Sequence, residues 1–106
     1  MVAVTKYLLK EYRRPSVDFG SVYISSGVAE LMERHKLNPY VYLGRAAVQD
    51  WGEVSFEQER ENAKALAAGQ AVLAQYDLPD HIPSHRALQI IIEPTRSATT
   101  IILASE

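Results

Sequence analysis

The chain has 106 residues, which suits one domain that buries about 65% of the surface of its unfolded chain. It contains no cysteine, which excludes disulfides and thiolate metal ligands. Its 11 basic and 13 acidic residues give a formal net charge of −2, whereas dedicated nucleic-acid-binding domains usually carry a basic excess. We expect a soluble, cytoplasmic protein, because no stretch reaches the ~18 apolar residues of a membrane span and the N-terminus lacks a secretory signal.

Residues 1–19 are predicted to form an N-terminal arm, and residues 20–106 a single α+β domain. The arm begins with strand-like alternation and continues with a spacing that fits a helix. Pro15 ends either element, because the residue before a proline avoids helical angles. We expect the arm to cover a sheet edge or to join a dimer; the alternative is phosphate binding by Arg13 and Arg14.

One strand and two helices are predicted next. Val22–Ile24 is a short apolar run between glycine-containing turns, which is typical of a strand. Ser26 is expected to cap a helix that ends near His35, because its hydroxyl can accept from an orphan backbone N–H. Asn38, followed by a proline, is expected to open a second helix that ends near Gln49.

The tripeptide Asp50-Trp51-Gly52 indicates a tight turn that carries a large anchor. Burial of the Trp51 indole would contribute on the order of 2–3 kcal/mol. Asp50 would cap a backbone N–H or orient a partner group.

A third and longest helix is predicted from Ser55 to about Tyr76. Ser55 and Gln58 match the capping box at its start. Asn62, Gly69 and Tyr76 lie two turns apart on one stripe, and a mid-helix glycine costs roughly 1 kcal/mol against alanine. We therefore expect another backbone, that of the C-terminal hairpin, to cross the helix at Gly69, and a buried Asn62 to find hydrogen-bond partners.

The C-terminus predicts a β-hairpin, because two β-branched apolar runs, 88–92 and 98–103, flank a few turn residues. The expected fold is thus three helices packed on a small antiparallel sheet built around this hairpin, with Val22–Ile24 as a third strand. The loop before it holds His81 and His85, but Pro83 lies between them and breaks the helix that metal ligation at this spacing needs. No metal and no cofactor are predicted.

These motifs resemble a family of small bacterial proteins carried on plasmids and other mobile elements. The resemblance covers about four fifths of the chain, from residue 20 onward, and is most specific in the hairpin, residues 91–100. It implies a shared fold and a mobile-element context, but no reaction. The chain departs from the family pattern at Ala46, Gln49 and Thr95, and the histidine missing at Ala46 counts against acid/base chemistry that depends on it.

Two functions are considered. The first is a non-enzymatic binding or accessory protein of a mobile element, which interferes with a host nucleic-acid-directed system through a protein partner or as a homodimer. The second is a small ribonuclease like the bacterial RNase toxins, by analogy of fold. In the ribonuclease, Arg96 would stabilise the phosphate with Thr99 and Thr100, and His85 or Asp50 would move protons.

Arg96 also has a purely structural interpretation, in which it pairs with Asp50 or with the Asn62 carbonyl and locks the hairpin to the helix. Thr99 and Thr100 point to opposite faces of their strand, so at most one of them can share a site with Arg96 on a given face. The candidate residues for a functional site or a structural clasp are Asp50, Trp51, Asn62, Arg96, Thr99 and Thr100.

Overall fold

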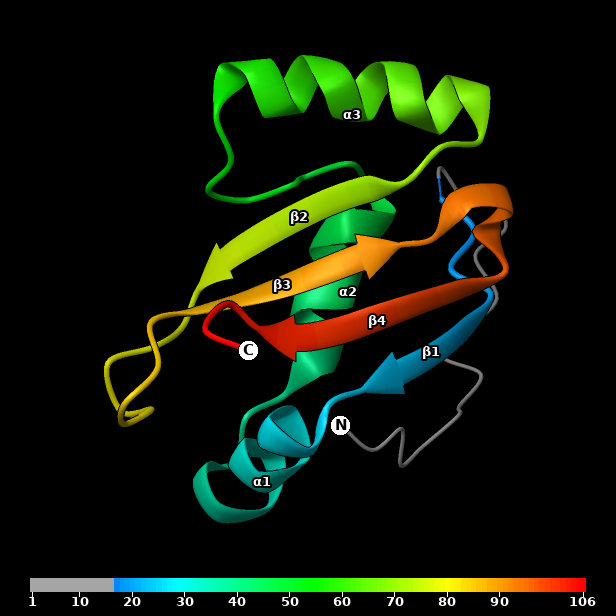
Figure 1. The fold of residues 1–106 in the computed structure, drawn as a ribbon. Helices are drawn as coiled ribbons and strands as arrows, with labels where there is room; N and C mark the ends of the chain where they lie inside the picture. Colours follow the sequence, from blue (N-terminus) through cyan, green and yellow to red (C-terminus); the bar gives the residue numbers. More distant parts are fainter. Residues whose placement is uncertain (1–16) are drawn as a thin grey trace.

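The computed structural model describes residues 17–106, which form three α-helices, four strands and one short 3-10 turn (Figure 1). None of the helices in this part of the chain is long and apolar enough to cross a membrane. In chain order the elements are β1 (Ser21–Ile24), α1 (Ser26–His35), α2 (Pro39–Ala47), α3 (Phe56–Ala68), β2 (Val72–Asp77), β3 (Ala87–Ile92), η1 (Pro94–Arg96) and β4 (Ala98–Leu103).

The four strands form one sheet in the order β1-β4-β3-β2, so the C-terminal hairpin β3–β4 occupies its centre. The predicted α+β class, with the hairpin as its organising element, is confirmed. The sheet is mixed, because β1 pairs parallel with β4 while the other two pairs are antiparallel. A parallel pair needs a long connection, and here α1, α2, α3 and two strands lie between its members.

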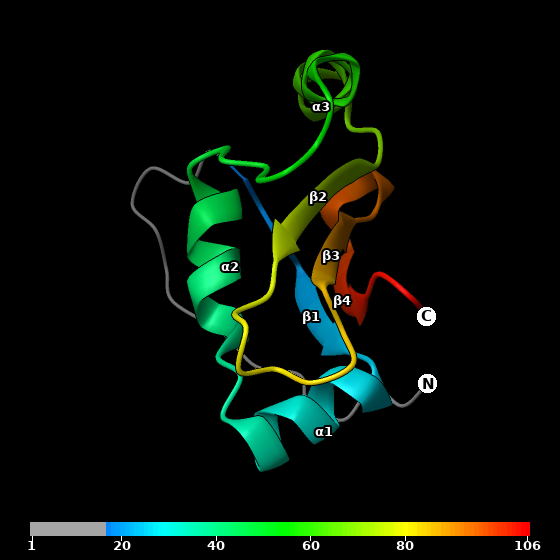
Figure 2. The ribbon, with the colours of Figure 1, turned by 90° about the vertical axis from the view of Figure 1, so that its left-hand side faces the viewer.

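The helices take three positions around the sheet. Figure 2 shows α2 against one face, α3 beyond the edge formed by β2, and α1 beyond the end of the sheet where β1 and β4 finish. The opposite face of the sheet carries no helix among the described residues, and we call it the open face (Figure 2).

The core lies between α2 and the covered face of the sheet. Alternate residues of every strand point into it, so the central strands read apolar at every second position. Its fully buried side chains come from the helices and from all four strands, and the largest of the apolar ones are Tyr76, Leu43, Leu88, Ile90, Ile92, Ile101 and Leu103. Burial of this apolar surface is the main favourable term of folding.

The prediction of one helix from Ser55 to Tyr76 was wrong in its second half. The helix ends at Ala68, Gly69 follows as its left-handed cap (φ 71°), and Val72–Asp77 is the strand β2. Residues 72, 74 and 76 alternate as in a strand, whereas residues 72, 73 and 76 continue the helical stripe of residues 62, 65, 66 and 69, so both periods fit this stretch. Gly69 is needed for its positive φ, since a Cβ there would meet nothing within 4 Å.

The first helix is capped one residue earlier than expected. Ser25, not Ser26, accepts from the backbone N–H of Val28 (3.2 Å), and Ser26 is the first helical residue. Most of the predicted N-terminal arm lies outside the described residues. Its last residues contribute Val17 and Phe19 to the hydrophobic core.

Candidate functional site

The turn Asp50-Trp51-Gly52 lies against the outer edge of β2. Gln75 donates its N–H to the Trp51 carbonyl (3.1 Å), and its own carbonyl accepts from the N–H of Glu53 (2.6 Å). Gly52 pairs with Gln75 as an isolated parallel bridge at φ +77°, where any Cβ would overlap the Gln75 carbonyl oxygen. The turn therefore works as a fragment of a fifth strand, with Trp51 buried beneath it.

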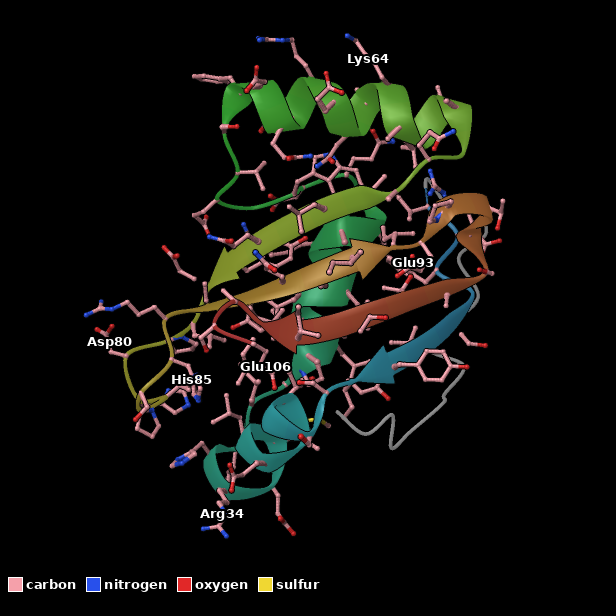
Figure 3. All side chains as sticks on the ribbon, in the orientation of Figure 1. Arg34, Lys64, Asp80, His85, Glu93 and Glu106 are labelled. Carbon is pink, nitrogen blue, oxygen red and sulfur yellow. The ribbon has the colours of Figure 1, made fainter. Side chains whose placement is uncertain are left out.

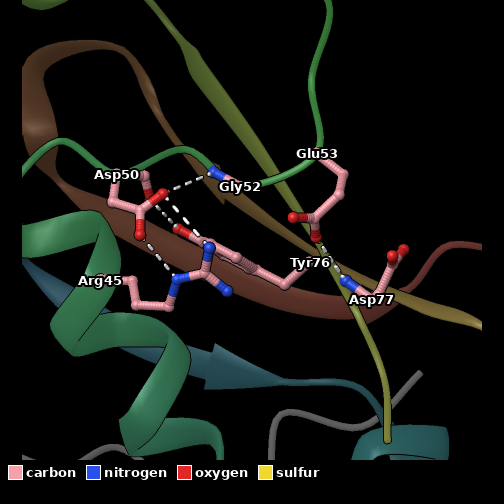
Figure 4. A network of polar contacts seen from close by, with 6 residues as sticks. All are labelled: Arg45, Asp50, Gly52, Glu53, Tyr76 and Asp77. Carbon is pink, nitrogen blue, oxygen red and sulfur yellow. Dashed lines mark hydrogen bonds and ion pairs between the residues drawn. The ribbon is translucent and has the colours of Figure 1, made fainter.

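Arg45 of α2 joins this turn to the sheet. Its guanidinium donates to both carboxylate oxygens of Asp50 (2.7 and 3.3 Å) and lies 4.7 Å from the centre of the Tyr76 ring. The Tyr76 hydroxyl donates to the Asp50 carbonyl (2.8 Å), and the Asp50 carboxylate also accepts from the Gly52 N–H (3.1 Å; Figure 4). The Asp50 carboxylate thus binds the Arg45 guanidinium and the Gly52 N–H, and the Asp50 carbonyl binds the Tyr76 hydroxyl.

The contacts within this network shift the pKa values of its ionisable groups in the directions that stabilise the contacts. The hydrogen bond from Arg45 lowers the pKa of Asp50 and raises that of the guanidinium. Burial is the main cause that raises the pKa of the Tyr76 hydroxyl, with the Asp50 charge adding to it. Arg45 and Asp50 thus stay ionised and Tyr76 stays neutral at physiological pH, which suits a structural contact better than proton transfer.

Asn62 of α3 is fully buried and acts on the same edge of the sheet. Its amide donates to the Leu73 carbonyl (2.7 Å) and its oxygen accepts from the Leu73 N–H (3.2 Å), as a neighbouring strand would. Gln58, one turn earlier, donates to the same oxygen (2.9 Å). The expectation that a buried Asn62 needs partners is confirmed, and those partners are the backbone groups of Leu73 and the side chain of Gln58.

Arg96 caps the C-terminal end of α3. Its guanidinium donates to the carbonyls of Ala65 (3.1 Å) and Leu66 (3.4 Å) in the last turn of the helix and of Gln70 (2.6 Å) just beyond it, and so adds to the backbone hydrogen bond that Ala65 accepts from Gln70 (2.9 Å). Nearby, the Thr95 N–H donates to the Gly69 carbonyl (3.0 Å). The expected crossing of the helix by the hairpin at Gly69 is therefore wrong, because the helix ends at Ala68 and only the hairpin turn contacts the Gly69 carbonyl.

Thr99 and Thr100 lie on opposite faces of β4. Thr99 is fully buried and donates its hydroxyl to the Phe19 carbonyl (2.7 Å), which fastens the segment before β1. Thr100 lies on the open face and is half-buried. The structure therefore does not gather Asp50, Asn62, Arg96 and the threonines around one cleft. Asp50, Asn62, Arg96 and Thr99 each connect a different pair of segments, and Thr100 faces outward on the open face.

His85 lies far from Arg96. The six residues of β3, which rise about 3.3 Å each, separate His85 before the strand from Arg96 after it. Figure 3 shows His85 with Asp80 at one end of the sheet and Glu93, next to the hairpin turn, at the other. Residues 77–80 and 82–86 line a hollow of ≈ 620 Å³, and of the residues considered for the ribonuclease only His85 lines it.

Residues 17–106 contain no group of three or more side chains placed to hold a metal ion. Separately, the ribonuclease arrangement of Arg96 with His85 is not assembled in this fold, because the two residues lie beyond opposite ends of β3.

A contact that the sequence analysis missed fastens the C-terminal end of β4 to α1. Glu106 accepts from the Ser25 hydroxyl (2.6 Å) and from the Leu103 N–H (2.7 Å), and Ser25 in turn caps α1. A carboxylate is favoured at a helix N-terminus. No local pattern signals this contact, because Ser25 and Glu106 are 81 residues apart.

The open face was also missed, because it needs the strand register. Tyr23, Thr100, Ile91 and Leu73 form one row across all four strands. Ile102 lies in the next row beside Gln89 and Gln75, whose side chains hydrogen-bond each other (3.0 Å). All these side chains are half-buried, and none is charged.

The comparisons with known proteins give no relative. No family model, no curated protein and no solved structure matches the chain.

Proposed function

We propose that this chain is a small non-enzymatic binding protein that engages a protein partner through the open face of its sheet. In keeping with its resemblance to plasmid-borne proteins, we propose that it serves a mobile genetic element in the cytoplasm and interferes with a host nucleic-acid-directed system. The observation that carries the proposal is the uncharged, half-buried row of side chains across the open face.

The size and chemistry of this face fit a binding surface. Four strands about 4.8 Å apart, with six residues rising about 3.4 Å each, give a face of roughly 300–400 Å². Its apolar side chains, Leu73, Ile91 and Ile102, cover part of this area, and exposed apolar patches on a monomer are often functional. Ile91 lies on a central strand in the apolar row, and Tyr23 supplies an aromatic ring of the kind that anchors protein interfaces.

The polar candidate residues support binding rather than catalysis. The Arg96 donors are engaged by backbone carbonyls, the Asn62 amide by a strand edge, and the Asp50 carboxylate by Arg45 and Gly52. A phosphate or a proton-transfer partner would have to displace these internal hydrogen bonds.

An Ile91→Gln variant tests the proposal, because it adds polarity to the centre of the open face without touching the buried side of the sheet. The matched control is Phe56→Gln, since Phe56 is 82% exposed at the start of α3 and away from this face. Proteins that wild type and Phe56→Gln retain from a bacterial lysate should be lost from Ile91→Gln, while thermal unfolding shows all three folded. Retention of the same proteins by Ile91→Gln contradicts the use of this face.

The ribonuclease alternative is tested by expression of the wild-type chain. We expect normal growth on overexpression and intact RNA after incubation with the purified protein. Growth arrest with RNA cleavage that Arg96→Ala abolishes and Arg96→Lys restores would overturn the proposal. A merely destabilising Arg96→Ala is recognised by its lower melting temperature.

A further inference from the structure

The two edge strands of the sheet, β2 and β1, differ in whether their outward backbone groups have hydrogen-bond partners. On β2 the outward backbone groups are paired: Asn62 takes both groups of Leu73, the turn at residues 51–53 takes both groups of Gln75, and the Glu53 carboxylate accepts from the Asp77 N–H (2.8 Å). Such an edge cannot accept another strand.

The other edge, β1, is left unpaired by the described residues. Ser21 and Ser25 donate their N–H groups to carbonyls of Ser97 and Ile101, so the odd-numbered residues of β1 face β4. Val22 and Ile24, the alternate residues, therefore direct their N–H and C=O groups away from the sheet. No residue from 17 to 106 forms a backbone hydrogen bond with these groups.

The sequence of β1 is short, but it carries no charged residue and no proline of the kind that keeps edge strands apart. Its four residues, Ser-Val-Tyr-Ile, include no lysine, no proline and no charge. A second strand can thus approach it without a like-charge or steric penalty at the edge. The edge recognises main chain, so its occupant is an extended strand.

We propose that the occupant is a second copy of this chain, paired antiparallel through β1 about a two-fold axis. In this register Val22 of one copy lies opposite Ile24 of the partner copy, and the reverse pair forms by symmetry. All outward groups of both residues are then satisfied in four hydrogen bonds. Registers centred on Val22 or on Ile24 satisfy only one such pair, because the chain beyond them leaves the strand conformation at Gly20 (φ +63°) and at the start of α1.

The same register places Tyr23 opposite its own copy. Tyr23 lies between the two bonded pairs, at a non-hydrogen-bonded position, where facing Cβ atoms come within about 5 Å. Both rings then lie on the open face, and the two sheets continue as one of eight strands.

This inference goes beyond the proposed function, which concerns the face and a different protein. A short strand pair buries little area, so we expect a weak, concentration-dependent dimer.

Cross-linking tests the register directly, because the chain has no cysteine of its own. Under mild oxidation, Tyr23→Cys should form a disulfide-linked dimer much faster than Leu73→Cys. Leu73 shares the same open face and row but lies on the closed edge β2, so it is the matched control. Equal rates for the two variants would overturn the proposed register.

Charge exchange at the same position tests the two-fold symmetry. In sedimentation equilibrium up to about 1 mM, wild type should approach twice the monomer mass. Tyr23→Lys and Tyr23→Glu should each associate at least about tenfold more weakly, because like charges then face each other across the strands. An equimolar mixture of the two variants should recover association. A wild type that stays monomeric throughout, or a mixture that does not recover, overturns the proposal in favour of an edge filled by residues 1–16 or by another protein.

Discussion

Asn62 shows how one side chain can stand in for a strand. Its amide group carries a donor and an acceptor with the spacing of a peptide unit, and both form hydrogen bonds with the backbone of Leu73. A buried polar group whose partner is removed costs more than its hydrogen bond contributes, because the desolvated group stays unpaired. Asn62 therefore closes part of the β2 edge and ties α3 to the sheet.

Asn62→Ala should lower the free energy of unfolding by about 2–3 kcal/mol, because it leaves both backbone groups of Leu73 without partners. Chemical denaturation measures this loss. Gln58→Ala is the control: it removes only the bond to the Asn62 oxygen and should cost less than about 1 kcal/mol. Faster amide exchange at Leu73 in Asn62→Ala alone would identify the opened edge, whereas equal losses in the two variants would contradict this role.

At the scale of elements, the turn Asp50–Gly52 packs so closely on β2 that position 52 has no room for a side chain. Gly52 adopts φ +77° beside the Gln75 carbonyl and the Tyr76 ring. An L-residue there meets two penalties, the left-handed backbone and the overlap with backbone atoms. The glycine is thus what lets α2, the turn and β2 approach one another.

Gly52→Ala should therefore destabilise the protein by more than about 3 kcal/mol, because neither the strand nor the turn can move without breaking their hydrogen bonds. Gly69→Ala is the matched control. It has a similar φ of 71° but open space around the new methyl group, so its cost should stay near 1 kcal/mol. Thermal or urea unfolding of the two variants checks the difference, and equal costs would show that the contact with β2 is not decisive.

At the scale of the whole molecule, stability should depend on acid pH through Asp50. Arg45 lowers its pKa below the ordinary 3.8, so the folded state binds this proton less readily than the unfolded state. The resulting stabilisation is present above the unfolded pKa and is lost as the pH falls through the folded one. The wild-type unfolding free energy should thus decline below about pH 4 in part because of this group.

Asp50→Asn should flatten that decline while it keeps the acceptor for the Gly52 N–H. Because the pair with Arg45 is partly exposed, the loss at pH 7 should not exceed about 1 kcal/mol. Urea unfolding between pH 2 and pH 7 measures both effects. Glu61→Gln, which removes an exposed charge of α3, should leave the acid slope close to that of wild type.

Local patterns predicted the elements whose signals are short-range. The hairpin, the strand at Val22–Ile24 and the start of α3 at its capping serine all follow from neighbouring residues. The end of α3 does not, because residues 72, 74 and 76 fit a strand while residues 72, 73 and 76 fit a continued helical stripe. Gly69 followed by a short apolar run was the available signal for a helix end and a new strand.

The candidate residues divide in the same way. The sequence by itself determined that Asn62 and Trp51 would be buried, because spacing and residue type decide burial, and it left open whether Asp50 would cap a backbone N–H or orient a partner group. Only the tertiary structure decided what Arg96 and Asn62 bind, which edge of the sheet is closed and which face is open. Those properties depend on strand order, on register and on contacts between residues far apart in the chain. A linear pattern of polar and apolar residues does not specify which distant backbone group will lie beside a given side chain.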